Sequence, residues 1–277
     1  IWTHVNPYTG LAYKDDPVWV LCEIVNEQDL FTDSVSQLKA YKESKYYADE
    51  YRQMFKAWLD KNGLEADWEN MPVFNDDPIH AEFKVEVSKN FYREMYDHMR
   101  AIGVKIPITG TNWNKPQTGL AKSQEDMDFS DNHPYFYDWK WGTQERICAN
   151  VPITSRPFAN PNMGRMVLAG KPFFISEWDM PWPNSYRASA VPHFAGVACL
   201  QNWGGLTIHT YSYSTKLERM NMLGKEMSAE KIGNVPYRQG IFSAWNDPAK
   251  FGLFYHASII PRREDVRPSE NKVTIRV

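Results

Sequence analysis

Two glutamates, Glu27 and Glu177, each end an apolar run of the sequence, although a carboxylate is costly to bury. Glu27 ends residues 20–27 (VLCEIVNE), and Glu177 ends residues 171–177 (KPFFISE). A protonated carboxyl and an ionised carboxylate about 5 to 5.5 Å apart can cleave a glycosidic bond with retention of configuration. Neighbouring strands lie about 4.8 Å apart, so strand ends can bring such a pair together. The sequence therefore predicts acid and nucleophile roles for these residues.

The elements that must position the glutamates are strands alternating with helices. Runs rich in β-branched and aromatic residues predict strands, and longer patterns that stop at glycine predict helices. The expected strands cover residues 18–25, 105–114, 128–139, 171–183 and 204–214, and the expected helices cover residues 34–62, 79–102 and 188–200. This alternation indicates parallel βα units, as in a βα barrel, whose active site lies at the carboxyl ends of the strands.

The helix expected over residues 79–102 has an apolar face, and Gly103 is its expected stop. The side chains expected on that buried face are Phe83, Val87, Phe91, Met95, Met99 and Ile102.

Length and charge limit the possible architectures and partners. The chain of 277 residues has no internal repeat or Gly/Ser linker, so we expect one domain over residues 1–260 and a polar tail over residues 261–277. With 31 basic and 34 acidic residues the net charge is -3, which gives no electrostatic footprint for nucleic acid or an anionic membrane. No stretch reaches the roughly 20 apolar residues of a membrane span. The aromatic share of 14%, with 11 Trp and 15 Tyr, fits either core packing or binding platforms.

The sequence lacks the patterns of metal sites and of acyl-transfer enzymes. The three cysteines are widely spaced, and the histidines show no H-x-H or H-E-x-x-H spacing, so we expect neither a metal nor a cofactor. Ser176 has no G-x-S-x-G surround, which argues against a serine nucleophile. Glu23, inside the first expected strand, is interpreted as a buried ion-pair partner.

Three short motifs in order carry a family resemblance. Asn26-Glu27 ends one strand, His133 and Tyr135 form H-x-Y in a later strand, and residues 176–178 read SEW. In this order and spacing they resemble glycoside hydrolase clan A, the (β/α)8 retaining β-glycosidases, and most of all family 5 (cellulase-like) and related large bacterial enzymes. The resemblance covers nearly the whole chain and implies a β-linked oligosaccharide or polysaccharide substrate, with the sugar and linkage left open.

The resemblance implies a role for each residue of the catalytic centre. Glu27 would be the general acid/base and Glu177 the nucleophile, while Asn26 would hydrogen-bond the 2-hydroxyl of the sugar. Tyr135 would lie against the nucleophile, and His133 would lie near the acid/base. Strict alternation along a strand would point Asn26 and Glu27 to opposite faces, so we expect a bulge there if both act.

The resemblance also implies residues that contact the sugar. Asn112, Trp113 and Trp178 would line the sugar subsites. At the eighth strand, where the family commonly places a tryptophan, this chain reads IHTYSYS, so His209 or Tyr211 would take that place.

The chain departs from the family at its beginning. The motifs correspond to strands four to eight, so about five βα units are expected and the first three strands are absent. Five strands would leave two open barrel edges, which predicts either a homo-oligomer that covers them or a piece of a longer chain. A different class remains open, namely a carbohydrate-binding or scaffold protein with a degenerate, inactive barrel. An unrelated α/β enzyme is the third interpretation.

Overall fold

The structure, a computed structural model, is a mixed α/β protein. It describes residues 1–32, 44–75, 77–112, 118–136, 150–155, 164–182, 184–211, 242–245 and 247–276. The chain divides into two compact units, the first formed by Ile1–Asp131 with Met166–Lys171 and the second by Asn132–Arg165 with Pro172–Arg276. Within the described ranges the parallel strand pairs are small and no closed barrel is found.

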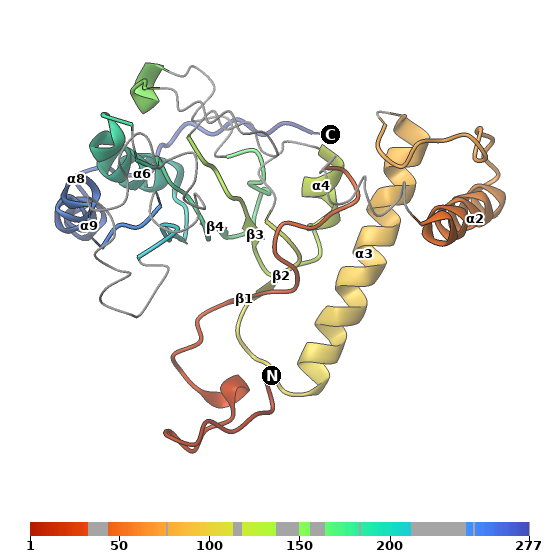
Figure 1. Cartoon of the computed structure of the whole chain (residues 1–277), viewed down its shortest axis with the longest axis horizontal. Helices are drawn as coiled ribbons and strands as arrows, with labels where there is room; N and C mark the ends of the chain where they lie inside the picture. Colours follow the sequence, from red (N-terminus) through yellow and green to blue (C-terminus); the bar gives the residue numbers. More distant parts are fainter. Residues whose placement is uncertain are drawn as a thin grey trace. The chain divides into compact units, whose positions relative to one another are not determined.

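In the first unit, a parallel strand pair is connected by two helices (Figure 1). Strand β1 (Cys22–Glu23) pairs with β2 (Ile108–Thr109), with Cys22 opposite Ile108. Helices α2 (Lys45–Asn62) and α3 (Pro78–Ala101) lie between them in the chain. The remaining elements of this unit are the 3-10 helix η1 (Tyr13–Asp15), helix α4 (Thr118–Ser123) and strand β3 (Ser130–Asp131).

The first strand is much shorter than predicted. Residues 18–25 were expected to pair, but β1 covers Cys22–Glu23, and Val18 and Val20 are 71% and 73% exposed. The β-branched run has the propensity for a strand, but the described residues give it a strand partner only beside β2, while the N–H groups of Val18 and Trp19 donate back to Asp16. In the described parts of the other expected strands, the paired segments likewise cover two or three residues.

Helix α3 confirms the predicted helix, although its buried face differs. The carboxylate of Asp77 accepts a hydrogen bond from the His80 backbone N–H, and Gly103 follows with φ 95°. Phe83 and Met99 are buried as predicted, whereas Phe91 is 44% exposed. Helix α3 packs against α2 near its start and also against α4. Its buried residues therefore do not lie on one apolar stripe.

Helix α2 begins at Lys45, and residues 34–43 of the predicted helix lie outside the described ranges. It ends at Gly63, which has the left-handed φ of 64° that glycine adopts without strain. Its inner face forms an aromatic core with α3, made of Tyr51, Phe55, Leu59 and Phe83.

The second unit repeats the parallel βα arrangement. Strand β4 (Phe173–Ile175) pairs with β5 (Gly205–Leu206) through helix α6 (Arg187–Gln201), which confirms the helix predicted over residues 188–200. A Cβ at Gly205 would lie 2.6 Å from the Phe174 ring, so this register requires glycine.

Two further helices, α8 (Pro248–Phe251) and α9 (Phe254–Arg263), pack on α6, and the 3-10 helix η2 (Ile153–Ser155) lies earlier in the chain. Helix α9 runs past residue 260, where the polar tail was expected to begin.

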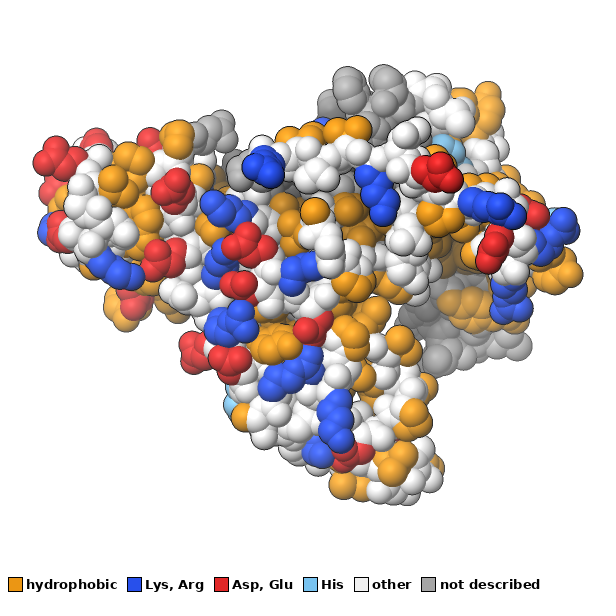
Figure 2. Space-filling view, turned by 180° about the vertical axis from the view of Figure 1, so that it is seen from behind, with side chains coloured by type: hydrophobic (Ala, Val, Ile, Leu, Met, Phe, Trp, Pro, Cys, Tyr) orange, Lys and Arg blue, Asp and Glu red, His pale blue; other side chains and the backbone are white. Residues whose placement is uncertain are grey.

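The surface agrees with the balanced charge of the sequence. On the face drawn in Figure 2, Lys and Arg side chains lie among Asp and Glu side chains. Among the helices that the structure describes, none has the length and hydropathy that crossing a membrane requires.

A buried histidine between α2 and α3 makes the stability of the first unit depend on pH. His80 Nε2 lies 2.7 Å from the Tyr51 hydroxyl, and Nδ1 lies 2.9 Å from Oδ1 of Asn75. Burial, with a smaller effect from the charge of Lys84, lowers the pKa of His80 from 6.5 to about 4. The neutral ring is therefore favoured in the folded chain, and protonation favours unfolding.

We expect the unfolding free energy to fall as pH decreases from 6.5 to 4, by at most about 1.4 kcal/mol per pH unit from this group. Above pH 6.5 the contribution is complete, because the ring is neutral in both states. Urea unfolding of wild type and His80→Gln should show a difference that shrinks with acidification. His98→Gln, on the exposed side of the same helix, is the matched control and should keep the wild-type pH dependence. A constant difference between wild type and His80→Gln would contradict this assignment.

Candidate active site

Glu177 follows strand β4 and is held by two side chains of the same unit. The Tyr135 hydroxyl donates a hydrogen bond to Glu177 Oε2, and His133 Nδ1 lies 3.5 Å from the same oxygen. The other ring nitrogen of His133 lies 2.7 Å from Ser176 Oγ. His133 is fully buried, whereas the Glu177 side chain is 26% exposed. The result is a carboxylate that is oriented by a phenol and an imidazole and still reaches solvent.

Tyr135 is itself fixed by backbone pairing and by ring contacts. It forms a parallel bridge with Asp179, and the Phe136 N–H donates to the Asp179 carbonyl at 3.0 Å. Its ring meets Phe242 at a centroid distance of 5.6 Å and His209 at 6.2 Å, both in edge-on geometry. The expected contact of Tyr135 with Glu177 is thus present, while its catalytic role stays a prediction.

In the first unit, Glu27 lies where the backbone leaves the strand pair. The Ile24 N–H still donates to the Thr109 carbonyl of β2, and the Val25 N–H donates to the Gly110 carbonyl directly after it, at 3.0 Å each. The Glu27 N–H then donates to Oδ1 of Asn112 at 3.0 Å, and Nδ2 of Asn112 donates to Oδ1 of Asn26 at 3.3 Å. One buried amide therefore holds both residues of the Asn-Glu motif.

The backbone departs from strand alternation at this motif, as expected, but through a left-handed residue. Glu27 has φ 52°, a region that residues with a Cβ rarely occupy. The left-handed conformation changes the direction of the chain at Glu27. The Glu27 N–H then donates to the side chain of Asn112 instead of to a neighbouring strand.

Two of the predicted subsite residues have other surroundings. Asn112 is fully buried and positions Asn26 and Glu27. Trp178 is 1% exposed and stacks on Phe194 at a centroid distance of 4.2 Å, so its indole belongs to the core. The family resemblance implied a subsite position for this indole, but residues adjacent in an extended chain point to opposite sides, and Trp178 points away from the side of Glu177 into the core.

The remaining predicted aromatic residues lie at the surface or outside the described ranges. Tyr211 is 51% exposed and lies 5.4 Å from the ring of Trp245 and 6.3 Å from that of Phe251, measured between centroids. Sequence reasoning missed Trp245 and Phe251, because they lie in a segment without a strand pattern. Trp113 lies outside the described residues.

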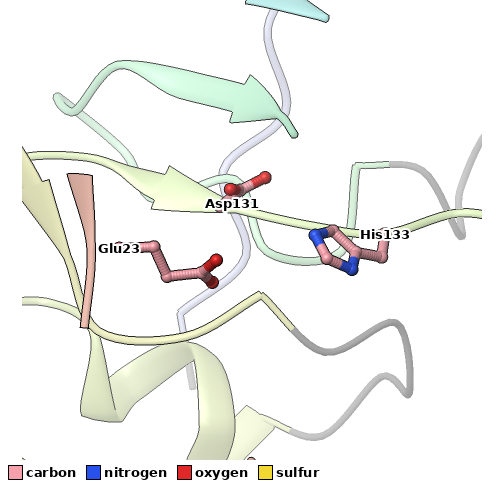
Figure 3. Close-up of side chains that lie close together, drawn as sticks. All are labelled: Glu23, Asp131 and His133. Atoms are coloured by element: carbon pink, nitrogen blue, oxygen red, sulfur yellow. The ribbon is translucent and has the colours of Figure 1, made fainter. Parts of the chain in front are cut away.

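A second pair of carboxylates lies in the first unit. Glu23 of β1 and Asp131 of β3 have oxygens within 4.8 Å of each other (Figure 3). The sequence interpretation of Glu23 as an ion-pair partner did not anticipate a second acid beside it. Hard divalent cations take six or more oxygen ligands or bound waters, so two carboxylates alone do not define a metal site.

No family model matches the chain, and no curated protein matches it in sequence. Glu27 and Glu177 belong to different units, so the separation of about 5 to 5.5 Å expected between their carboxylates stays a prediction.

The left-handed backbone at Glu27 gives a test that separates conformation from side-chain chemistry. Glu27→Gly should be more stable than Glu27→Ala by about 1 kcal/mol, because glycine adopts this φ without the strain of a Cβ. Glu65 is an exposed loop residue without a positive φ. There the alanine variant should be at least as stable as the glycine variant. Chemical denaturation of the four variants measures both differences. Equal differences at the two positions would show that Glu27 carries no such strain.

Proposed function

We propose that the chain is a retaining glycoside hydrolase that cleaves β-linked sugars, with Glu177 as nucleophile and Glu27 as general acid/base. The observation that supports this most directly is the Tyr135 hydroxyl bond to Glu177, with His133 beside it. A nucleophilic carboxylate must be ionised and held in one orientation. A hydroxyl that donates to the carboxylate fixes the direction of its oxygens.

The proposed reaction has two displacements. In the first, a Glu177 oxygen attacks the anomeric carbon while Glu27 gives its proton to the departing glycosidic oxygen. In the second, Glu27 takes a proton from water, which attacks the same carbon and releases Glu177. Two inversions return the original β configuration, and no step uses a cofactor. Asn112, through Asn26 and the Glu27 backbone, would hold the acid/base region in place.

The fold proposed for this activity is a partial (β/α)8 barrel with strands four to eight. It is supported by the two parallel pairs, β1 with β2 and β4 with β5, each joined through helices. A barrel that lacks three strands would have two open edges, which a homo-oligomer would cover.

A carbohydrate-binding protein without catalysis is the second candidate. The observation that favours it is the exposed group of Tyr211, Trp245 and Phe251, whose ring centroids lie 5.4 to 6.4 Å apart. Aromatic side chains combine a large apolar face with low conformational entropy loss, which suits them to stacking on a ligand.

A panel of aryl β-glycosides (glucoside, mannoside, galactoside, xyloside and cellobioside) tests both candidates. Wild type should cleave at least one, and Glu177→Gln should lose on the order of a thousandfold or more in kcat, because the covalent step is removed. Glu65→Gln makes the same charge change at an exposed site and should keep wild-type activity. No cleavage, together with a sugar-dependent rise in melting temperature, would instead support the binding protein.

Azide distinguishes the two proposed roles by product configuration. With Glu177→Ala, azide should displace the leaving group directly and give an α-glycosyl azide through one inversion. With Glu27→Ala, azide should attack the glycosyl-enzyme and give a β-glycosyl azide through two inversions. NMR of the products reads the configuration, and exchanged outcomes would reverse the assignments.

A further inference from the structure

A buried ion pair lies directly after the Glu177 strand. Lys250 Nζ lies 3.0 and 3.2 Å from the two carboxylate oxygens of Asp179, and both side chains are about 1% exposed or less. Asp179 is two residues beyond Glu177, and Lys250 belongs to helix α8. Burial of two charges is costly unless their geometry and hydrogen bonds are good, and an apolar pair of similar volume is often as stable. The pair therefore requires an explanation other than stability alone.

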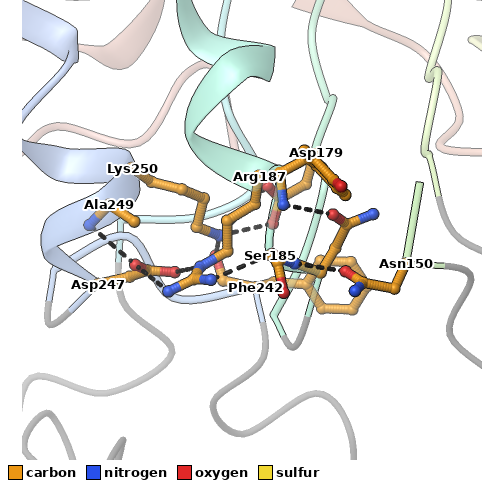
Figure 4. A network of polar contacts seen from close by, with 10 residues as sticks. Asn150, Asp179, Ser185, Arg187, Phe242, Asp247, Ala249 and Lys250 are labelled. Carbon is orange, nitrogen blue, oxygen red and sulfur yellow. Dashed lines mark hydrogen bonds and ion pairs between the residues drawn. The ribbon is translucent and has the colours of Figure 1, made fainter. Parts of the chain in front are cut away.

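Lys250 makes a third contact, which leads toward Tyr135. Its Nζ donates to the Phe242 carbonyl at 3.3 Å, so the ammonium joins this segment to Asp179 (Figure 4). The same carbonyl accepts from the Thr210 N–H at 3.1 Å. The Phe242 ring then meets the Tyr135 ring edge-on at 5.6 Å. Lys250 thus fixes the backbone that supports one side of Tyr135.

Asp179 supports Tyr135 from its backbone side. The two residues form a parallel bridge, and the Phe136 N–H bonds to the Asp179 carbonyl at 3.0 Å. The contacts therefore form a closed circuit, from Asp179 to Lys250, to Phe242, to Tyr135 and back to Asp179. Glu177 receives the hydroxyl of the residue that this circuit holds.

We propose that Lys250 is a positioning residue for the Tyr135 hydroxyl, and through it for the Glu177 carboxylate. This inference rests on the proposed function for its catalytic consequence, whereas the effect on Tyr135 holds for either candidate function. The described hydrogen bonds of the Lys250 ammonium go to Asp179 and the Phe242 carbonyl, so its effect on Tyr135 is indirect.

The protonation of Asp179 decides which substitutions of the ion pair avoid an isolated buried charge. Burial raises the pKa of Asp179 to about 7, against the opposing effect of Lys250, which lowers it. When the ammonium is removed, the acid can take up a proton and need not remain as an isolated buried charge. Lys250→Met, which keeps an unbranched side chain but removes the charged terminal group, and the double variant Asp179→Asn/Lys250→Met are therefore suitable tests.

A nearby ion pair supplies the matched control. Arg187 Nε and Nη2 lie 2.6 and 3.0 Å from the carboxylate oxygens of Asp247. Arg187→Gln removes one positive charge from the same region, and Asp247 still caps α8 by accepting from the Ala249 N–H at 3.1 Å. Among the described residues, the side-chain hydrogen bonds of Arg187 go to Asp247 and to the Asn184 carbonyl.

The experiment combines kinetics with NMR of the Tyr135 phenol carbon, assigned by Tyr135→Phe. We expect Lys250→Met and the double variant to lower kcat about tenfold or more with KM little changed, since an orienting contact is lost. In both, the Tyr135 resonance should move toward its position in Glu177→Ala, where the hydroxyl has lost its acceptor. Arg187→Gln should leave kcat and the resonance unchanged, and Lys250→Arg should recover part of both.

The outcomes separate this inference from the proposed function. If the double variant regains wild-type stability, resonance and kcat together, the pair is only structural and the inference is overturned. If the Arg187→Gln control moves the resonance as far as Lys250→Met does, the effect is one of charge and the inference is also overturned. If wild type cleaves no glycoside but the resonance moves as expected, the proposed hydrolase fails while the positioning of Tyr135 stands.

Discussion

Parallel strand pairing is the constraint on which both units depend, and it is very short. β1 and β2 pair over two residues, as do β4 and β5 in the register that the structure defines. Parallel pairing over so few hydrogen bonds is weak by itself, so the chain that leaves each pair must be held by side chains and helices. The carboxylates proposed to be catalytic lie in these departing segments.

In each unit, buried polar side chains hold the chain where it leaves the strand pair. In the first unit the amide of Asn112 receives the Glu27 N–H and donates to Asn26. In the second, the Asp179 carboxylate and the Lys250 ammonium connect the end of the β4 segment to Phe242. Buried polar groups are costly when unsatisfied and directional when satisfied, so they place a backbone more narrowly than apolar packing does.

The order and type of the elements could be predicted from the sequence, whereas their lengths could not. The apolar periodicity and glycine stop of residues 79–102 match α3, and the helical stretch of residues 188–200 matches α6. Strand lengths depend on a partner that local sequence does not reveal, which explains why Val18 and Val20 are exposed despite their propensity. For the same reason, Phe91 fits an apolar stripe but faces solvent on a helix that packs against two neighbours.

For the candidate site, motif reasoning predicted the contact of Tyr135 with Glu177 but not the surroundings of Trp178 or the role of Lys250. Lys250 is 71 residues from Asp179, and a lysine is more often exposed than buried, so no local pattern marks it. The partners of Asn112 are 85 and 86 residues away. Such contacts are set by the tertiary arrangement, and a single sequence contains no signal for them.

The left-handed backbone at Glu27 has a consequence for how this position can vary. With Glu27 as the proposed general acid/base, two separate demands act there, one for a carboxylate and one for a residue that tolerates φ 52°. Val, Ile and Thr are excluded by the second demand whatever the chemistry, while Gly, Asn and Asp meet it most easily. Aspartate alone among the residues that tolerate the backbone retains an acid, but its side chain is one methylene shorter. An aspartate at position 27 would therefore keep the carboxylate but hold it closer to the backbone. Glycine and asparagine suit the backbone but remove the carboxylate.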